Sequence, residues 1–130
     1  MLKKAKFLAK EAHLRLKYML TKDCLFCKIV KGEINSKPIL ENKHVLAIFD
    51  INPIASVHIL IIPKEHIDSV MTIGDDDSGV IIEMYKAAQK LVLDLKLEAF
   101  RLAFNGGKNQ HVPHLHMHLV SGKKIEWKKL

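Results

Sequence analysis

Three histidines occupy alternate positions near the end of the chain, His114, His116 and His118, and each is followed by an apolar residue. Successive side chains of a β-strand point to opposite faces, so this spacing predicts three imidazoles on one face. The intervening residues would enter the core on the other face: Leu115, Met117 and Leu119. Imidazole titrates near neutral pH, so such a row suits proton transfer, metal ligation or nucleophilic attack. The simpler alternative is a strand whose solvent face happens to carry histidines.

The two cysteines, Cys24 and Cys27, form a Cys-x-x-Cys motif. A disulfide within one short segment constrains little of the unfolded chain, so a structural cross-link is not expected. In an intracellular protein this spacing indicates half of a metal site or a redox pair. A thioredoxin-like role is disfavoured, because no strand–CxxC–helix unit with the usual flanks is present. Metal ligation and free thiols packed in the core both stay open.

The positive charge is concentrated at the N-terminus. Residues 1–22 hold six lysines and Arg15 against Glu11, so they carry +6 of the net +7. The remaining 108 residues are nearly neutral, and no nucleic-acid groove is expected across them. Apolar residues recur at helical spacing in residues 1–22, which predicts a basic amphipathic helix. It would dock on the body, fray, bind a membrane surface or acidic partner, or direct organelle import.

The rest of the chain, residues 23–130, is expected to form a single α+β domain with a mostly antiparallel sheet. Strands are predicted at 39–41, 45–49, 57–62, 100–104 and 114–120. Helices are predicted at 25–31, at 66–73 and from Ser78 to about Leu97. No apolar run is long enough to span a bilayer, and no secretory signal is visible, so a cytoplasmic location is expected.

Several motifs resemble those of the histidine triad (HIT) superfamily of nucleotide hydrolases and transferases. They are residues 23–29 (DCLFCKI), 44–51 (HVLAIFDI), 58–67 (HILIIPKEHI) and 114–120 (HLHMHLV), in that order. Gln110, Val112 and a tail bearing Trp127 are similar to the Hint branch, the adenosine phosphoramidases. The resemblance implies a HIT-like fold, with a five-stranded sheet, one long helix and one or two short ones. It also implies a homodimer, with the long helix and strand 100–104 as the interface.

The resemblance assigns roles that agree with imidazole chemistry. A neutral imidazole is a good nucleophile towards phosphorus, and its phosphoryl adduct is labile enough to be hydrolysed in a second step. His116 would be the nucleophile, its Nδ1–H held by the backbone carbonyl of His114. His118 would hold a non-bridging phosphate oxygen, and His58 would orient the site. The expected substrate is a purine nucleoside 5′-phosphoramidate or a related nucleotidyl conjugate, with a dinucleoside polyphosphate as the runner-up. A binding module with little turnover, which would use residues 1–22 as its contact, is the other alternative.

Nucleotide contacts follow from the same resemblance. Asp50 would accept the ribose hydroxyls, and the base would lie between apolar side chains: Phe26, Ile29, Ile48 and Phe49. Without the resemblance, these four would be ordinary core residues. The phosphate side would be formed by Asn105, Gln110, His111 and Val112. His111 departs from the hydroxyl residue usual there, and the 105–114 loop is about two residues short. A fourth imidazole would either donate to the phosphate or leaving group, or narrow the pocket.

Zinc-bearing members of the family imply a ligand set of Cys24, Cys27, His66 and His114, with His44 as a spare candidate. Two thiolates and two imidazoles form a closed tetrahedral site of the structural kind. We therefore expect structural Zn²⁺, which the chemistry at His116 does not need.

Overall fold

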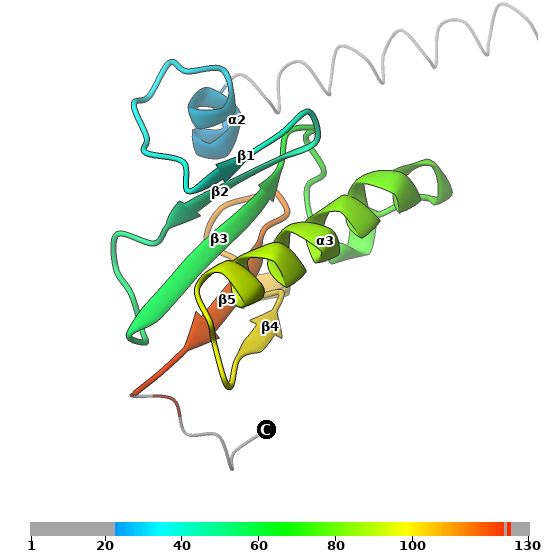
Figure 1. Cartoon of the computed structure of the whole chain (residues 1–130). Coiled ribbons are helices and arrows are strands. Elements are labelled where there is room, and N and C mark those ends of the chain that lie inside the picture. The colour runs from blue at the N-terminus through cyan, green and yellow to red at the C-terminus, as the bar shows by residue number, and fades with distance from the viewer. Residues whose placement is uncertain (1–22, 124, 126–130) are drawn as a thin grey trace, which may run out of the picture.

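A five-stranded antiparallel sheet carries a helix on each face in the computed structural model, which describes residues 23–123 and 125 (Figure 1). The strands lie in the order β1-β2-β3-β5-β4. Their bounds are β1 Leu40–Glu41, β2 Val45–Phe49, β3 Val57–Pro63, β4 Arg101–Ala103 and β5 Met117–Ser121. The predicted α+β class is confirmed. The predictions for residues 1–22 and Trp127 lie outside the described residues.

The long helix α3, Ser78–Asp94, runs across one face of the sheet (Figure 1). Its buried stripe packs on alternate residues of the three central strands: Val45, Ala47, Ile59, Ile61, Met117 and Leu119. The helix ends three residues before the predicted Leu97. Lys96 adopts a left-handed φ of 53°, and the Leu97 N–H reaches back to the Val92 carbonyl at 3.0 Å. This Schellman arrangement satisfies the last carbonyls and turns the chain towards β4.

The short helix α2, Leu25–Val30, covers part of the other face. Its Phe26 and the two cysteines pack on Leu60 and Ile62, which alternate with the α3-facing residues of β3. Cys24 caps the helix, since its Sγ accepts the Cys27 N–H at 3.4 Å. Lys31 is the C-cap, and Gly32 follows with a φ of 79°, where a Cβ would be strained. The predicted helix at 25–31 is therefore one residue too long.

The sequence prediction of one long histidine-bearing strand was wrong in its first half, because β5 begins only at Met117. If the register of the Ile61–Met117 pair continued, Leu115 would lie opposite Pro63, which has no N–H to donate to the ladder. The Leu115 N–H instead donates to the Ile67 carbonyl at 2.6 Å. The predicted facing still holds, because Leu115, Met117 and Leu119 all enter the α3 core.

Segment 66–73 was predicted as a short helix, and that prediction was also wrong. Only Val70–Thr72 forms a 3₁₀ turn, which begins where the Ser69 side chain accepts the Met71 N–H at 3.1 Å. Residues 66–69 are not helical, and the Ile67 carbonyl bonds to the histidine segment. This places His66 against His114, with ring centroids 4.8 Å apart. Within the described residues, no helix combines the length and hydrophobicity needed to cross a membrane.

Candidate functional site

The functional side chains lie on the sheet face that α2 covers. Register across β2, β3 and β5 aligns Ile48, Leu60 and His118 in one row. Asp50 follows β2 directly, and its N–H donates to the His58 carbonyl at 2.9 Å. The face thus carries a cluster of Asp50, His58 and His118 at one end and a cysteine–histidine cluster at the other. His116 precedes β5 between them.

His116 is held in one tautomer. Its Nδ1 lies 2.7 Å from the backbone oxygen of His114, a carbonyl that can only accept, so Nδ1 carries the proton. The Phe26 ring stands edge-on to the imidazole at 5.0 Å between centroids, and the residue is 8% exposed. Within the described residues, no group pairs with Nε2 of His116. Its lone pair is therefore free for nucleophilic attack, in the arrangement that the resemblance implied.

His118 lies beside His116 and contacts His58. The two rings His116 and His118 are 5.0 Å apart, and Nδ1 of His118 is 2.8 Å from Nε2 of His58. Burial lowers the pKa of His118 to about 4, assisted by the neighbouring imidazoles and opposed by Asp50. Burial also lowers the pKa of His58, again opposed by Asp50, whose Oδ2 is 3.4 Å from His58 Nε2. Both imidazoles are therefore neutral at pH 7.

The second cluster joins Cys24, Cys27, His66 and His114, whose ligand atoms all lie within 4.8 Å of one another. Nδ1 of His114 is 3.3 Å from the Cys24 Sγ and 3.4 Å from the Cys27 Sγ. Nδ1 of His66 is 3.2 Å from the Cys27 Sγ and 3.1 Å from Nδ1 of His114. Tetrahedral Zn²⁺ with ordinary bond lengths would separate such atoms by about 3.3–3.8 Å. The donor set therefore fits a tetrahedral metal ion with only slight expansion.

The pKa shifts at this cluster show which groups already have the form that binds a metal and which would first have to lose a proton. Burial, together with the neighbouring Cys24, raises the pKa of the Cys27 thiol to about 12 against a small opposing effect of Lys31. Burial lowers the pKa of His114 to about 4, although its hydrogen bond to the Pro63 carbonyl opposes the shift. The neutral His114 imidazole is therefore in the form that binds a metal, whereas the Cys27 thiol would release its proton only when a positive charge is placed beside it. The exposed His44 is not part of the cluster.

The residues predicted to contact a nucleotide differ in their burial and in the face of the sheet on which they lie. Phe26 is buried, and Ile29, Ile48 and Val112 pack around it, so these four line the floor of the site. His111 is exposed, so its side chain is free to meet a ligand. Phe49 is 51% exposed, but it pairs with Ile59, whose side chain packs under α3, so alternation puts Phe49 on the opposite face from the histidines and the structure does not bring it to the predicted base site.

Two polar side chains of the predicted set differ in their availability. The Asn105 amide nitrogen is 3.3 Å from Nε2 of His118, at the edge of the site. The Gln110 amide nitrogen donates to the carbonyls of Asp68 at 2.7 Å and Val112 at 3.0 Å. Gln110 therefore holds the 110–112 loop with its donors and has only its oxygen left for a ligand.

Sequence reasoning missed the groups that orient the histidines from outside. The Asp68 carboxylate is 2.6 Å from Nε2 of His66, the Pro63 carbonyl accepts from Nε2 of His114 at 2.8 Å, and the Ile54 N–H donates to Nδ1 of His58 at 3.2 Å. A carboxylate two residues after a candidate ligand is a readable signal for Asp68. The other two are backbone groups, which no residue type reveals.

Comparison with known proteins gives consistent matches. The family model described as the scavenger mRNA decapping enzyme C-terminal binding region matches residues 23–129. An adenosine 5′-monophosphoramidase of Saccharomyces cerevisiae is 38% identical over 112 residues, covering 80% of this chain and 69% of that protein. An uncharacterised HIT-like protein of Methanocaldococcus jannaschii is 35% identical over 99 residues, covering 75% of this chain and 77% of that protein.

Solved structures agree with these sequence matches. A HIT family hydrolase from Clostridium thermocellum superposes with a TM-score of 0.78 at 44% identity, covering 84% of this chain and 98% of the other. A histidine triad protein from Clostridium difficile gives a TM-score of 0.76 at 39% identity, covering 80% and 94%.

Proposed function

Because this chain belongs to the histidine triad family, we propose that it is a hydrolase that cleaves purine nucleoside 5′-phosphoramidates or related nucleotidyl conjugates. The observation that carries the proposal is the 2.7 Å bond from His116 Nδ1–H to the His114 carbonyl. It places the proton on Nδ1 and so directs the lone pair of the imidazole to Nε2, which is what a nucleophile towards phosphorus needs. The yeast relative, an adenosine 5′-monophosphoramidase, supports the substrate class.

The reaction would proceed in two displacements. Nε2 of His116 forms a bond to phosphorus while the bond from phosphorus to the leaving group breaks, and the leaving group takes up a proton. Water then attacks the nucleotidyl-histidine, which releases the nucleoside monophosphate and restores the imidazole. Negative charge on the non-bridging oxygens is best met by a donor already in place. His118, neutral at pH 7 and 5.0 Å from the His116 ring, is placed to donate to such an oxygen.

The substrate's nucleoside would lie over the floor formed by Phe26, Ile29 and Ile48, with the half-buried Asp50 accepting from the ribose hydroxyls. One oxygen of Asp50 already accepts the Asn52 N–H at 2.8 Å, which fixes the carboxylate. His111, exposed on the loop that Gln110 holds, would face the leaving group.

We propose that Cys24, Cys27, His66 and His114 hold Zn²⁺. A zinc ion bound there would supply structural cross-linking, because four protein ligands fill its tetrahedral shell. The set joins α2 to the segment that precedes β5. Cys24 is the N-cap of the helix, Cys27 lies within it, and His114 is two residues before His116. The two outer hydrogen bonds, to the Pro63 carbonyl and the Asp68 carboxylate, fix the histidine rings.

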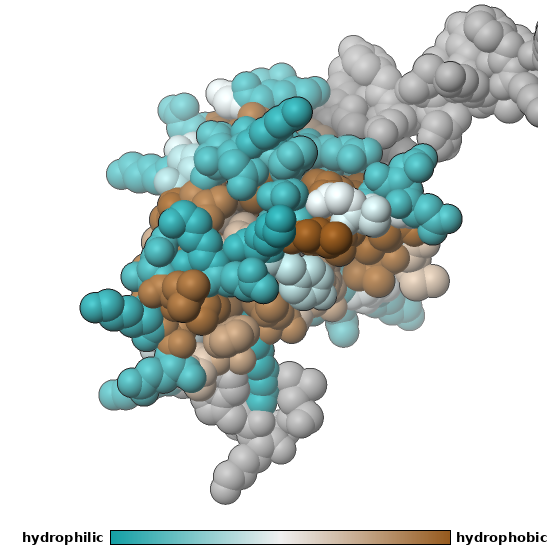
Figure 2. Space-filling model, turned by 45° about the vertical axis from the view of Figure 1, so that its right-hand side comes forward, coloured by the Kyte–Doolittle hydropathy of each residue, from teal (hydrophilic) through white to brown (hydrophobic). Residues whose placement is uncertain are grey.

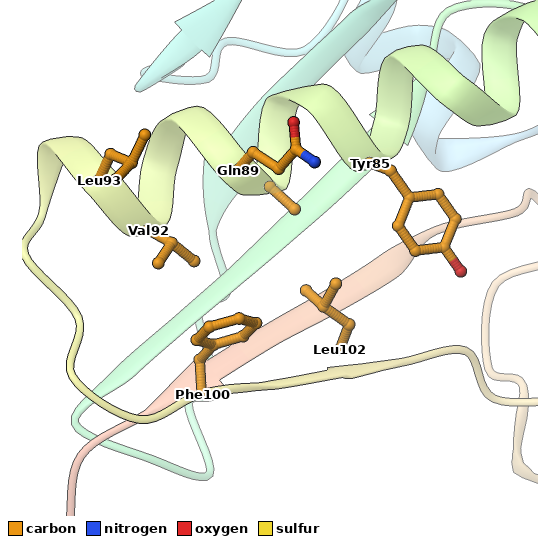
Figure 3. Close-up of a pocket in the computed structure, with 7 residues that line it drawn as sticks. Tyr85, Gln89, Val92, Leu93, Phe100 and Leu102 are labelled. Atoms are coloured by element: carbon orange, nitrogen blue, oxygen red, sulfur yellow. The ribbon is translucent and has the colours of Figure 1, made fainter.

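We propose a homodimer built on the opposite side of the sheet. A groove of about 480 Å³ runs between α3 and β4, lined by Tyr85, Gln89, Val92, Leu93, Phe100 and Leu102 among others (Figure 3). Leu93 is 75% exposed and Phe100 44%, and β4 is the outer strand of the sheet that the described residues form. Figure 2 shows hydrophobic surface interrupting the hydrophilic side chains on the face that carries α3. A second copy would cover the apolar groove and lie beside the outer strand β4.

The test is hydrolysis of adenosine 5′-phosphoramidate by the full chain, by His116→Ala and by His44→Ala. His44 is an exposed histidine outside both clusters, so its variant controls for loss of an imidazole as such. We expect release of adenosine monophosphate by the wild type and the control, and loss of more than about 10³-fold in His116→Ala. An inactive wild type that binds adenosine monophosphate by calorimetry would refute the proposal. Faster cleavage of a dinucleoside polyphosphate would replace the substrate class.

A further inference from the structure

Two clusters that each contain two histidines lie on the same sheet face, but the hydrogen bonds of their histidine rings differ. One is the Cys24–Cys27–His66–His114 set, and the other joins Asp50, His58 and His118. Two imidazoles and a carboxylate are a common ligand set for a divalent transition metal. Which role each cluster takes depends on the ring nitrogens that face inward, because a lone pair binds a metal and an N–H does not. The partner of the outward nitrogen decides this.

At the cysteine cluster, both outward nitrogens face acceptors. Nε2 of His114 donates to the Pro63 carbonyl at 2.8 Å, and Nε2 of His66 donates to the Asp68 carboxylate at 2.6 Å. In each ring, a single proton is therefore held on the outward nitrogen by its acceptor. The lone pairs on both Nδ1 atoms point inward, 3.1 Å apart, towards the sulfur atoms.

At the second cluster the outward nitrogen faces a donor. The backbone N–H of Ile54 donates to Nδ1 of His58 at 3.2 Å, so the proton of this neutral ring is on Nε2. The inward Nε2–H has the Nδ1 of His118 at 2.8 Å and the Asp50 carboxylate at 3.4 Å as its acceptors. The same logic then applies to His118: its Nδ1 accepts, so its proton is on Nε2.

Nε2 of His118 opens towards the reaction site, next to the amide of Asn105 at 3.3 Å. The nitrogen and oxygen of a side-chain amide exchange places by a rotation about χ2, so Asn105 can turn its oxygen towards this N–H. A phosphate oxygen arriving there would meet the same donor. The contact between His118 and His58, at 2.8 Å, is shorter than the contact between His118 and Asn105, and the Ile54 backbone N–H fixes the tautomer of His58. The His58 contact therefore sets the direction of this series of hydrogen bonds.

We propose that the backbone N–H of Ile54 is a positioning group that sets the tautomers of His58 and His118, so that Asp50, His58 and His118 form a proton-ordered donor relay and not a second metal site. The part of this inference that concerns catalysis, the delivery of the His118 Nε2–H to a phosphate oxygen, rests on the proposed function. The part that concerns tautomers does not, because it follows from the hydrogen bonds of the described residues alone.

The loop that presents this N–H is anchored at both ends. The Asp50 carboxylate accepts the Asn52 N–H at 2.8 Å on one side. On the other side, the Ser56 hydroxyl accepts the Lys123 N–H at 3.1 Å. Gly122 packs so closely that a Cβ built there would lie 2.7 Å from the Ser56 Cβ. The Ile54 side chain is 67% exposed, so the residue acts here through its backbone.

The direct test is the ring ¹⁵N spectrum of the zinc-loaded, full-length protein, in which protonated and unprotonated ring nitrogens have well-separated shifts. Signals are assigned with His58→Gln and His118→Gln. We expect a protonated Nε2 and an unprotonated Nδ1 for both histidines at pH 7. A protonated Nδ1 on His58 would overturn the inference, whether or not the protein hydrolyses phosphoramidates. Perturbation of these signals by a second equivalent of Zn²⁺ would overturn it too.

The functional test removes only the N–H. Ile54→Pro lacks it, and Ile54→Ala keeps it and serves as the reference for loss of the side chain. We expect kcat of the proline variant to fall about 10- to 100-fold below the reference with KM changed less than about twofold, since deleting a whole oxyanion donor costs about 10²–10³. If the proline variant does not fold, an amide-to-ester replacement at residue 54 removes the same donor without the ring. Equal kcat for the N–H-free protein and the reference would overturn the inference.

Discussion

Acid should destabilise this protein through His118. Burial lowers the pKa of that imidazole from its ordinary 6.5 to about 4 in the folded state. Between these values the unfolded chain binds the proton and the folded chain does not, so the free energy of unfolding decreases as the pH falls. The full shift corresponds to about 3 kcal/mol, and roughly 2 kcal/mol of it should be lost between pH 7 and pH 4.5.

Burial is the largest cause of this lowered pKa, and the contact with His58 adds to it. Protonation of His118 places an N–H on its Nδ1, which then faces the Nε2–H of His58 at 2.8 Å. Donor would then oppose donor in a contact that is partly shielded from water. Nearby His116 adds to the effect, and Asp50 only partly offsets it.

The assay is urea unfolding at pH 7, 5.5 and 4.5, with His118→Gln as the matched variant. Glutamine offers an amide oxygen that can accept the His58 Nε2–H, and it does not titrate. Other acid-sensitive groups are common to both proteins, so the difference between their losses isolates His118. We expect the wild type to lose about 2 kcal/mol more than the variant by pH 4.5. Parallel losses in the two proteins would show that His118 is not held neutral by its surroundings, and the reasoning would fail.

Three further predictions concern the metal cluster, the groove and the corner after β5. Asp68→Ala removes the carboxylate that orients His66 and should weaken zinc about 10- to 100-fold, measured by competition with a chromophoric chelator. Leu93→Asp places a charge in the groove and should convert the proposed dimer to a monomer in sedimentation equilibrium; a dimer that persists in the variant would place the interface elsewhere, and a monomeric wild type would refute the dimer. Gly122→Ala combines a φ of 92° with the approach to Ser56 and should lower the free energy of unfolding by about 2 kcal/mol or more, checked by urea titration. An unchanged free energy of unfolding would mean that the loop around Ser56 can move away from residue 122 at little cost.

The sheet could be predicted well because its strands obey alternation. In β3 the residues Ile59 and Ile61 face α3 while Leu60 and Ile62 face α2, so the apolar run predicted a strand buried on both faces. The facing of the three histidines followed from the same rule. The start of β5 did not, because it depends on Pro63 of the neighbouring strand, which has no N–H for the ladder.

The candidate site was predictable as a set of residue types and only partly as geometry. The side chains of the cysteine cluster were named in advance, and the structure brings all four together. The 66–73 segment was expected to be helical from its apolar residues, but the Ile67 carbonyl is needed by Leu115, and that tertiary bond overrides the local preference. The Ile54 N–H and the Pro63 carbonyl carry no sequence signal, since every residue has a backbone.

His114 links the two chemistries of this face, because its ring and its backbone belong to different sites. Its Nδ1 faces both cysteines, and its carbonyl accepts the Nδ1–H of His116, the proposed nucleophile, at 2.7 Å. The ring is held on the opposite side by the Pro63 carbonyl, and the backbone by the bond from the His114 N–H to the Val112 carbonyl at 2.8 Å. A metal ion that draws the ring towards the cysteines therefore also holds the carbonyl that fixes the tautomer of His116. The zinc proposed for this site would take no part in bond breaking. Its loss would nevertheless loosen the His114 carbonyl and, with it, the orientation of the His116 ring.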